Sequence, residues 1–142
     1  MQQPSRVLLI LGTVLFLLGL LNGAAVQSFL NPRMGLSAHL AAVQSALVLW
    51  ALGLMWPALR LGPRARAVAA GSAAFGMYAL WGALALAAMT GSSRDLPIAG
   101  RGYSASALAD TAVAVFLYAG SLSSVVATVL ILVGLAKHPS RA

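Results

Sequence analysis

The chain has 142 residues, of which 61% are hydrophobic and 8% are charged, and its mean hydropathy is +0.92. A soluble domain carries about a quarter charged residues, so the composition excludes an ordinary soluble protein and predicts an integral membrane protein. The absence of cysteine excludes disulfides, iron–sulfur clusters and zinc–thiolate sites, and the net charge of +7 comes without an aromatic-laced basic surface for nucleic acid.

Four apolar runs cover residues 7–30, 35–59, 67–90 and 105–136. Each run reaches the roughly 20 residues that a membrane-spanning helix needs. The first run exceeds the roughly 7–15 apolar residues of a signal peptide, so we expect it to be retained. The sequence therefore predicts an all-α integral membrane four-helix bundle that forms a single domain over residues 1–142.

A turn separates the first two runs at Asn31-Pro32, because proline fixes its own φ and disfavours helix at the preceding residue. Arg33 can then lie at the level of the lipid headgroups. We expect Ser37 to hydrogen-bond the free backbone N–H groups where the second helix begins. Two residues later the chain reaches His39, which lies in an otherwise apolar run.

His39 shares one helix face with Ala42, Val43 and Ala46, which follow it by three, four and seven residues. Two of these neighbours are alanines, which leave space beside the imidazole. The ring can therefore be a hydrogen-bond donor to another helix, or it can be positioned against a flat group. His138 follows Lys137 in the tail, and we expect it to have no comparable role.

The scarcity of metal ligands restricts what His39 could bind. The chain has two aspartates, Asp95 and Asp110, and no glutamate or cysteine, so it cannot build a tetrahedral zinc site around one histidine. A histidine can instead supply one axial ligand to a haem, whose macrocycle provides the other four nitrogens. A single protein ligand leaves the sixth position open, which favours Lewis-acid chemistry over bis-histidine electron transfer.

Basic residues are distributed unequally between the two predicted sides of the membrane. One side carries three basic residues, offset by Asp95 and Asp110; the three are Arg33, Arg94 and Arg101. The other side carries six: Arg6, Arg60, Arg64, Arg66, Lys137 and Arg141. Because cytoplasmic loops carry the excess of lysine and arginine, both termini are predicted to be cytoplasmic. The loop at 60–66 is then cytoplasmic and the loop at 91–104 lies outside.

Small residues recur at four-residue spacing on three of the predicted helices. They form a GxxxG motif at 19–23 and continue as Ser72, Gly76, Gly120, Ser124 and Thr128. Such spacing permits close backbone approach between helices in lipid. Packing within the chain is the favoured interpretation, with a dedicated oligomer interface as the alternative.

Polar side chains at membrane depth are costly, so each is a functional candidate. Gln27, His39 and Asp110 fall near the outer helix ends and could converge in one layer, although Asp110 could also be solvated or help cap the fourth helix. Interhelical hydrogen bonding is the simpler role for the amides, and bundle packing for the aromatic residues. The remaining candidates are Asn22, Gln44, Ser45, Tyr78, Trp81 and Tyr118.

The chain resembles hydroxylaminobenzene mutase over nearly its whole length, and three segments carry the resemblance. They are Asn31-Pro32-Arg33-Met34-Gly35-Leu36-Ser37-Ala38-His39-Leu40, Leu52-Gly53-Leu54-Met55-Trp56, and Leu96-Pro97-Ile98-Ala99-Gly100 before a serine-rich last helix. That family rearranges an aryl hydroxylamine to an aminophenol without net redox change. It is distantly similar to styrene oxide isomerase, a trimeric four-helix membrane enzyme that holds haem b at subunit interfaces through a histidine early in its second helix.

The resemblance implies an isomerase of the bacterial inner membrane that acts as a homotrimer on a small lipophilic aromatic substrate. It implies that His39 is the axial ligand of a ferric haem b, with Ala42 and Ala46 leaving room for the ring. The iron would polarise a hydroxylamine or an epoxide as a Lewis acid. Asn22 and Ser45 are candidates for orienting the substrate. Tyr78 and Tyr118, together with Trp81, are candidate walls of its pocket.

Two departures from the family pattern fall near these candidates. Ser45, preceded by Gln44, stands where the family commonly has an asparagine, and Leu80 stands where an amide would fall in the third helix. Two other functions stay open from the sequence. One is a small four-helix multidrug-type transporter with Asp110 as its carboxylate, and the other is a non-catalytic membrane haem protein.

Overall fold

The computed structural model describes residues 3–137, which are mostly helical. Four long helices are present: α1 (Gln3–Ala24), α2 (Pro32–Met55), α3 (Pro63–Thr90) and α4 (Ala107–Ala136). Two short 3₁₀ turns, η1 (Val26–Ser28) and η2 (Trp56–Ala58), follow α1 and α2. All four helices are long and apolar enough to cross a membrane, which confirms the predicted all-helical architecture.

The second helix begins three residues before the predicted start, and Asn31 explains the difference. Asn31 has extended backbone angles, and its Oδ1 accepts a hydrogen bond from the Met34 N–H at 3.1 Å, so it is the N-cap. Pro32 follows at the first helical position, where its missing N–H costs nothing. The expectation that Ser37 caps this helix is wrong, because Ser37 lies inside α2 and donates to the Arg33 carbonyl at 3.1 Å.

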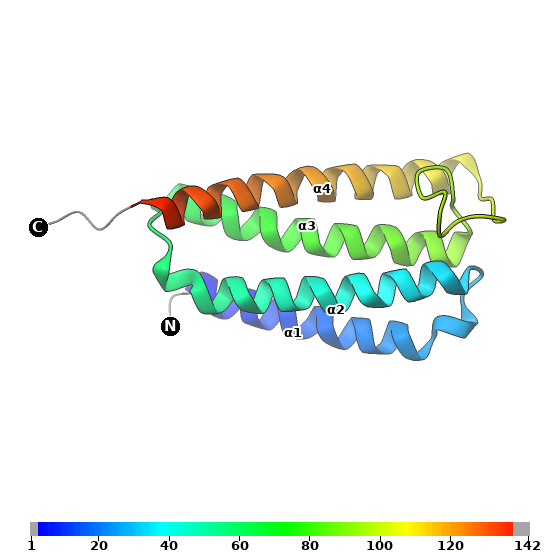
Figure 1. The fold of residues 1–142 in the computed structure, drawn as a ribbon, viewed down its shortest axis with the longest axis horizontal. Helices are drawn as coiled ribbons and strands as arrows, with labels where there is room; N and C mark the ends of the chain where they lie inside the picture. Colours follow the sequence, from blue (N-terminus) through cyan, green and yellow to red (C-terminus); the bar gives the residue numbers. More distant parts are fainter. Residues whose placement is uncertain (1–2, 138–142) are drawn as a thin grey trace, which may run out of the picture.

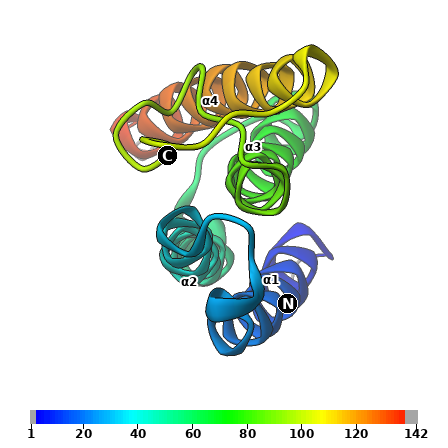
Figure 2. The same cartoon turned by 90° about the vertical axis from the view of Figure 1, so that its right-hand side faces the viewer.

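The helices form two antiparallel hairpins, α1 with α2 and α3 with α4, joined through contact between α2 and α3 (Figures 1 and 2). The α1–α2 and α3–α4 connections lie at one end of the bundle, and the α2–α3 connection lies at the other (Figure 1). Most of α4 is uncovered, and its buried residues are Val113, Gly120, Ala127 and Gly134.

Two groups of buried apolar side chains hold the hairpins together. The larger group takes residues from all four helices and from the α2–α3 connection, and it includes Leu8, Leu15, Leu49, Trp56 and Leu59. The smaller group lies toward the α3–α4 loop and consists of Met34, Ala83, Ala87, Ala88 and Val113. The alanines in this second group allow α2, α3 and α4 to approach closely beneath the loop.

The small residues at four-residue spacing are used within the chain, as the favoured interpretation held. A Cβ added to Gly19 of α1 would lie 2.9 Å from the Ala42 Cβ of α2. A Cβ added to Gly120 of α4 would lie 3.0 Å from the Ala79 Cβ of α3. Each hairpin therefore depends on glycine for its close helix contact.

Asn31 also links the two hairpins. It is fully buried, its N–H donates to the Ala88 carbonyl at 3.0 Å, and its Nδ2 donates to the Ala99 carbonyl at 2.9 Å. The first turn is thereby joined to the end of α3 and to the α3–α4 loop. At the opposite end, the Arg60 N–H donates to the Gly134 carbonyl at 3.0 Å.

The chain direction of the helices places the basic residues as the sequence predicted. Arg33, Arg94 and Arg101 belong to the end with the α1–α2 and α3–α4 connections, and the other end carries Arg6, Arg60, Arg64, Arg66 and Lys137. His138 and Arg141 lie outside the described residues. That the second end faces the cytoplasm stays a prediction.

Candidate functional site

The imidazole of His39 lies between α2 and α1 and is half-buried. Its Nδ1 is 2.7 Å from the Gly19 carbonyl oxygen of α1. A carbonyl oxygen can only accept, so Nδ1 carries the hydrogen and donates it. In the neutral ring this fixes the tautomer and leaves a lone pair on Nε2.

The glycine motif of α1 makes room for this ring. A Cβ added to Gly23 would lie 2.6 Å from Nδ1 of His39 and 2.8 Å from its Cε1. The imidazole can therefore lie against the α1 backbone only because position 23 has no side chain. Sequence reasoning treated the GxxxG motif as a packing signal and missed that it also seats the histidine.

The two ring nitrogens of His39 have different surroundings. Nδ1 is an interhelical donor, as one sequence interpretation held, whereas within residues 3–137 the structure gives Nε2 no hydrogen-bond partner. Metal-bound histidines commonly donate their other N–H to a backbone carbonyl or carboxylate, which orients the ring. The geometry of His39 therefore fits a metal ligand that binds through Nε2.

The described part of the chain contains no group of three histidine, cysteine or acidic residues that could hold a metal ion. A metal at Nε2 would then take most of its ligands from a non-protein group, and a haem macrocycle supplies four nitrogens. The residues around His39 fit such a group on this count, because one imidazole nitrogen is all that the protein has to provide.

The sequence profile of the styrene oxide isomerase family matches residues 4–136. The chain belongs to this family. It is similar to "Hydroxylaminobenzene mutase HabB" of Ectopseudomonas oleovorans, at 46% identity over 138 residues that cover 96% of this chain and 84% of the relative. It is also similar to "Hydroxylaminobenzene mutase HabA" of the same organism, at 34% identity over 125 residues that cover 87% of this chain and 93% of the relative.

These relatives confirm the resemblance that the sequence motifs indicated. The match to the styrene oxide isomerase family and the two mutase relatives show that the chain is an isomerase or mutase enzyme. No solved structure matches the chain significantly. The geometry of the candidate residues therefore comes from this structure alone.

Ala42 and Ala46 were expected to leave open space beside His39, and the structure fills that space. Both alanines are fully buried in the contact between α1 and α2, together with Leu15 and Leu49. The face they share with His39 is covered by α1, because Gly19 lets that helix approach Ala42 closely. A flat group would have to meet the outward edge of the imidazole instead.

The candidate orienting groups lie close to this hairpin. Asn22 is buried and donates from Nδ2 to the Gly35 carbonyl of α2 at 2.9 Å, one helical turn before His39. It therefore holds α1 to α2, which is the interhelical role that the sequence favoured for it. Ser45 is buried on α2, whereas Gln44 is exposed.

Tyr78 also connects helices, because its hydroxyl donates to the Leu11 carbonyl of α1 at 2.8 Å. Its ring meets Trp81 edge to face, with 6.5 Å between the ring centroids. Tyr118 does not join this pair. It is 63% exposed on α4, so it does not extend the aromatic wall expected from the sequence.

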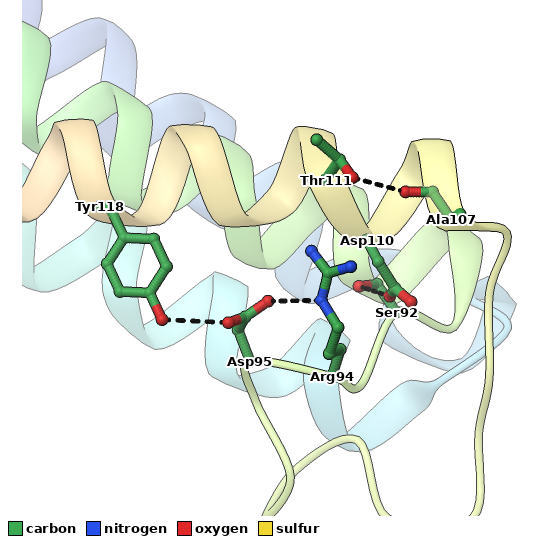
Figure 3. A network of polar contacts seen from close by, with 7 residues as sticks. All are labelled: Ser92, Arg94, Asp95, Ala107, Asp110, Thr111 and Tyr118. Atoms are coloured by element: carbon green, nitrogen blue, oxygen red, sulfur yellow. Dashed lines mark hydrogen bonds and ion pairs between the residues drawn. The ribbon is translucent and has the colours of Figure 1, made fainter.

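The expected convergence of Gln27, His39 and Asp110 has no polar contact to support it. Gln27 is exposed in η1, and His39 bonds to α1. The Asp110 carboxylate accepts a hydrogen bond from Ser92 at 2.5 Å, which links the start of α4 to the α3–α4 loop (Figure 3). Ser106, not Asp110, supplies the N-cap of α4.

Asp95 lies in the α3–α4 loop, and sequence reasoning did not include it among the site candidates. Its Oδ1 accepts a hydrogen bond from the Tyr118 hydroxyl at 3.0 Å, and its Oδ2 lies 3.2 Å from Arg94 Nε (Figure 3). Asp95 directly precedes the Leu96–Gly100 segment of the family motif, which was the available signal. Its pairing with α4 depends on the course of the loop, which the sequence does not specify.

Proposed function

We propose that the chain is a membrane-embedded mutase that converts a small aryl hydroxylamine to an aminophenol, with a haem b held by His39. Both relatives are named hydroxylaminobenzene mutases, which supports the reaction. Four helices of membrane-spanning length and hydropathy support insertion as a multi-pass protein of the bacterial inner membrane. The proposal of a haem rests on the geometry of His39: Nδ1 bonds to the Gly19 carbonyl, and residues 3–137 give Nε2 no hydrogen-bond partner.

The reaction needs no external electron donor, because substrate and product have the same atoms. The N–O bond breaks, a ring carbon–oxygen bond forms, and the ring hydrogen that the oxygen replaces ends on nitrogen. When bound, a ferric haem supplies a Lewis acid that polarises the N–O bond, and the same chemistry suits the C–O bond of an aryl epoxide.

The residues of the chain orient the imidazole and exclude water from the reaction. The Gly19 carbonyl holds the imidazole in one tautomer, and Asn22 fixes the α1–α2 contact one turn away. The four helices are apolar over membrane-spanning lengths. Apolar surroundings would keep water from the cationic intermediate that forms when the N–O bond breaks. Exclusion of water favours return of the oxygen to the ring over capture by solvent.

A homotrimer is part of this proposal. Ala42 and Ala46 are covered by α1, so the helix face that they share with His39 would offer no room for a haem within one chain. Further copies of the chain would then supply the rest of the pocket that holds the group. Ser45, Tyr78 and Trp81 remain candidates for contact with the substrate, whereas the exposed Tyr118 would reach it only across such an interface.

The test is the absorbance spectrum and turnover of the detergent-purified protein after haem supplementation. We expect a Soret band near one haem per chain and conversion of phenylhydroxylamine to an aminophenol. Turnover without a Soret band would refute the haem and leave the mutase. Haem without turnover would support a non-catalytic haem protein, and proton-coupled efflux lost in Asp110→Asn would support a transporter.

A further inference from the structure

A cavity of about 310 Å³ lies at the loop end of the bundle, away from His39. It is bounded by Met34 and Ser37 of α2, by Leu84 of α3, and by residues 95–99 of the α3–α4 loop. Most of this lining is apolar. An engineered apolar cavity of about 150 Å³ is large enough to bind benzene, so this one admits a substituted aromatic ring.

The cavity and His39 are on opposite faces of α2. At 100° per residue, Met34 points about 140° and Ser37 about 160° away from His39 around the helix axis. His39 meets α1, whereas the cavity is formed with α3 and the loop. The cavity is therefore a separate site within the chain.

Asp95 gives the cavity a charged acceptor that is fixed in place. Its side chain is 18% exposed, and both oxygens are held from outside the cavity, by Tyr118 at 3.0 Å and by Arg94 at 3.2 Å. The second polar group is the Ser37 hydroxyl, whose hydrogen is used on the Arg33 carbonyl. Both groups can therefore accept hydrogen bonds from a ligand, and neither has a hydrogen to donate.

The loop that forms one wall of the cavity is held by its own hydrogen bonds. The Leu96 N–H donates to the Ser93 carbonyl at 3.1 Å, and the Gly100 N–H donates to the Leu96 carbonyl at 2.8 Å. From the other hairpin, Asn31 donates to the Ala99 carbonyl at 2.9 Å. These contacts preform the cavity, so a ligand need not order the loop.

We propose that this cavity binds a small aromatic molecule that carries an N–H donor, with the ring among the apolar side chains and the donor on Asp95. Aryl hydroxylamines and aminophenols belong to this class, and in that choice the inference rests on the proposed function. The cavity is a second binding site for substrate or product at the loop end of the bundle.

The test is equilibrium dialysis of the detergent-purified protein against aniline, 2-aminophenol and toluene. Toluene has the ring without the donor, so the preference for aniline over toluene isolates the contribution of Asp95. We expect Asp95→Ala to reduce that preference about tenfold, which corresponds to about 1.4 kcal/mol. Asp110→Ala is the matched control, because Asp110 is a carboxylate near the same loop that does not line the cavity.

A second variant tests the volume. Leu84→Trp places a larger side chain in the cavity. Because the added ring takes up the space that a ligand would fill, the affinity for all three ligands should fall by about tenfold or more. Aniline bound at the haem iron would shift the Soret band, so binding that leaves the band unshifted and persists in His39→Ala reports the cavity.

Equal binding of aniline and toluene by the wild type would overturn the inference, as would an equal loss in Asp95→Ala and Asp110→Ala. Binding that disappears in His39→Ala would assign the ligand to the other site and overturn it too. Haem content, measured on the same samples, separates the two proposals. A protein that binds aniline through Asp95 but holds no haem refutes only the haem mechanism.

Discussion

Replacement of Gly23 by alanine tests whether contact with α1 positions His39. The added Cβ would lie 2.6 Å from Nδ1, whereas ordinary contact begins at 3.4 Å, so the ring must move by about 0.8 Å. A shift of that size lengthens the 2.7 Å bond to the Gly19 carbonyl toward about 3.5 Å, where it ceases to be a hydrogen bond. Loss of such an outer partner typically costs about 10–100-fold in metal affinity or activity.

The effect on folding stability should be small and can be separated from this loss. Alanine in place of glycine inside a helix gains about 0.5–1 kcal/mol, and overpacking costs about 1–3 kcal/mol where neighbours cannot move. The neighbour here is a side-chain ring that can rotate, so the two terms nearly cancel. Gly71→Ala is the matched control, because a Cβ on Gly71 of α3 would meet nothing within 4 Å.

The assay combines haem stoichiometry from the Soret band, turnover of phenylhydroxylamine, and thermal unfolding in detergent. We expect Gly23→Ala to lose haem and turnover while its unfolding temperature is nearly unchanged. Gly71→Ala should keep its haem and its turnover. Wild-type haem content and turnover in Gly23→Ala would refute the argument that the Gly19 contact orients the imidazole.

Two further substitutions separate the roles of the turn and of the histidine. His39→Ala should empty the haem site and cost about 0.6 kcal/mol of stability, the average for a hydrogen bond between membrane helices; haem retained with an unshifted Soret band would exclude His39 as the ligand. Asn31→Ala removes the N-cap of α2 and the bond to Ala99, and should lower the unfolding free energy by about 2–3 kcal/mol. Ser37→Ala is its control, because the bond of Ser37 to Arg33 lies within one helix, and an equal loss there would contradict the capping role of Asn31.

The hydropathy of the sequence was sufficient to predict the four helices, because about 20 apolar residues in a row have few other stable arrangements. Helix ends were less accurate, since the capping group at Asn31 precedes the apolar run and Ser37 offered a plausible alternative. That Asn22 would hydrogen-bond across helices was predictable from its residue type at membrane depth. Its acceptor, the Gly35 carbonyl, depends on how α1 and α2 align, which the sequence does not specify.

The surroundings of His39 were harder to predict than His39 itself. Its residue type and position follow from the motif, whereas the direction of the ring depends on which helix covers Ala42. Tyr118 illustrates the same limit, because an exposed tyrosine on α4 pairs with Asp95 only through the path of the loop. In both places the sequence pattern was insufficient because the position of the side chain depends on contacts between segments far apart in the sequence.

The partner of Nδ1 determines what kind of ligand His39 can be. A carboxylate partner would draw the hydrogen away and give the ring imidazolate character, which raises its basicity toward a metal. The partner here is the neutral Gly19 carbonyl, and the two carboxylates of the described residues, Asp95 and Asp110, bond elsewhere. A neutral imidazole donates less electron density, so a ferric iron on His39 would stay the better Lewis acid, as an isomerisation without net redox change requires. Resonance Raman spectroscopy of the reduced haem protein should therefore show an iron–histidine stretch typical of neutral imidazole. A frequency typical of imidazolate would contradict the assignment of Gly19 as the partner that sets the chemistry of the site.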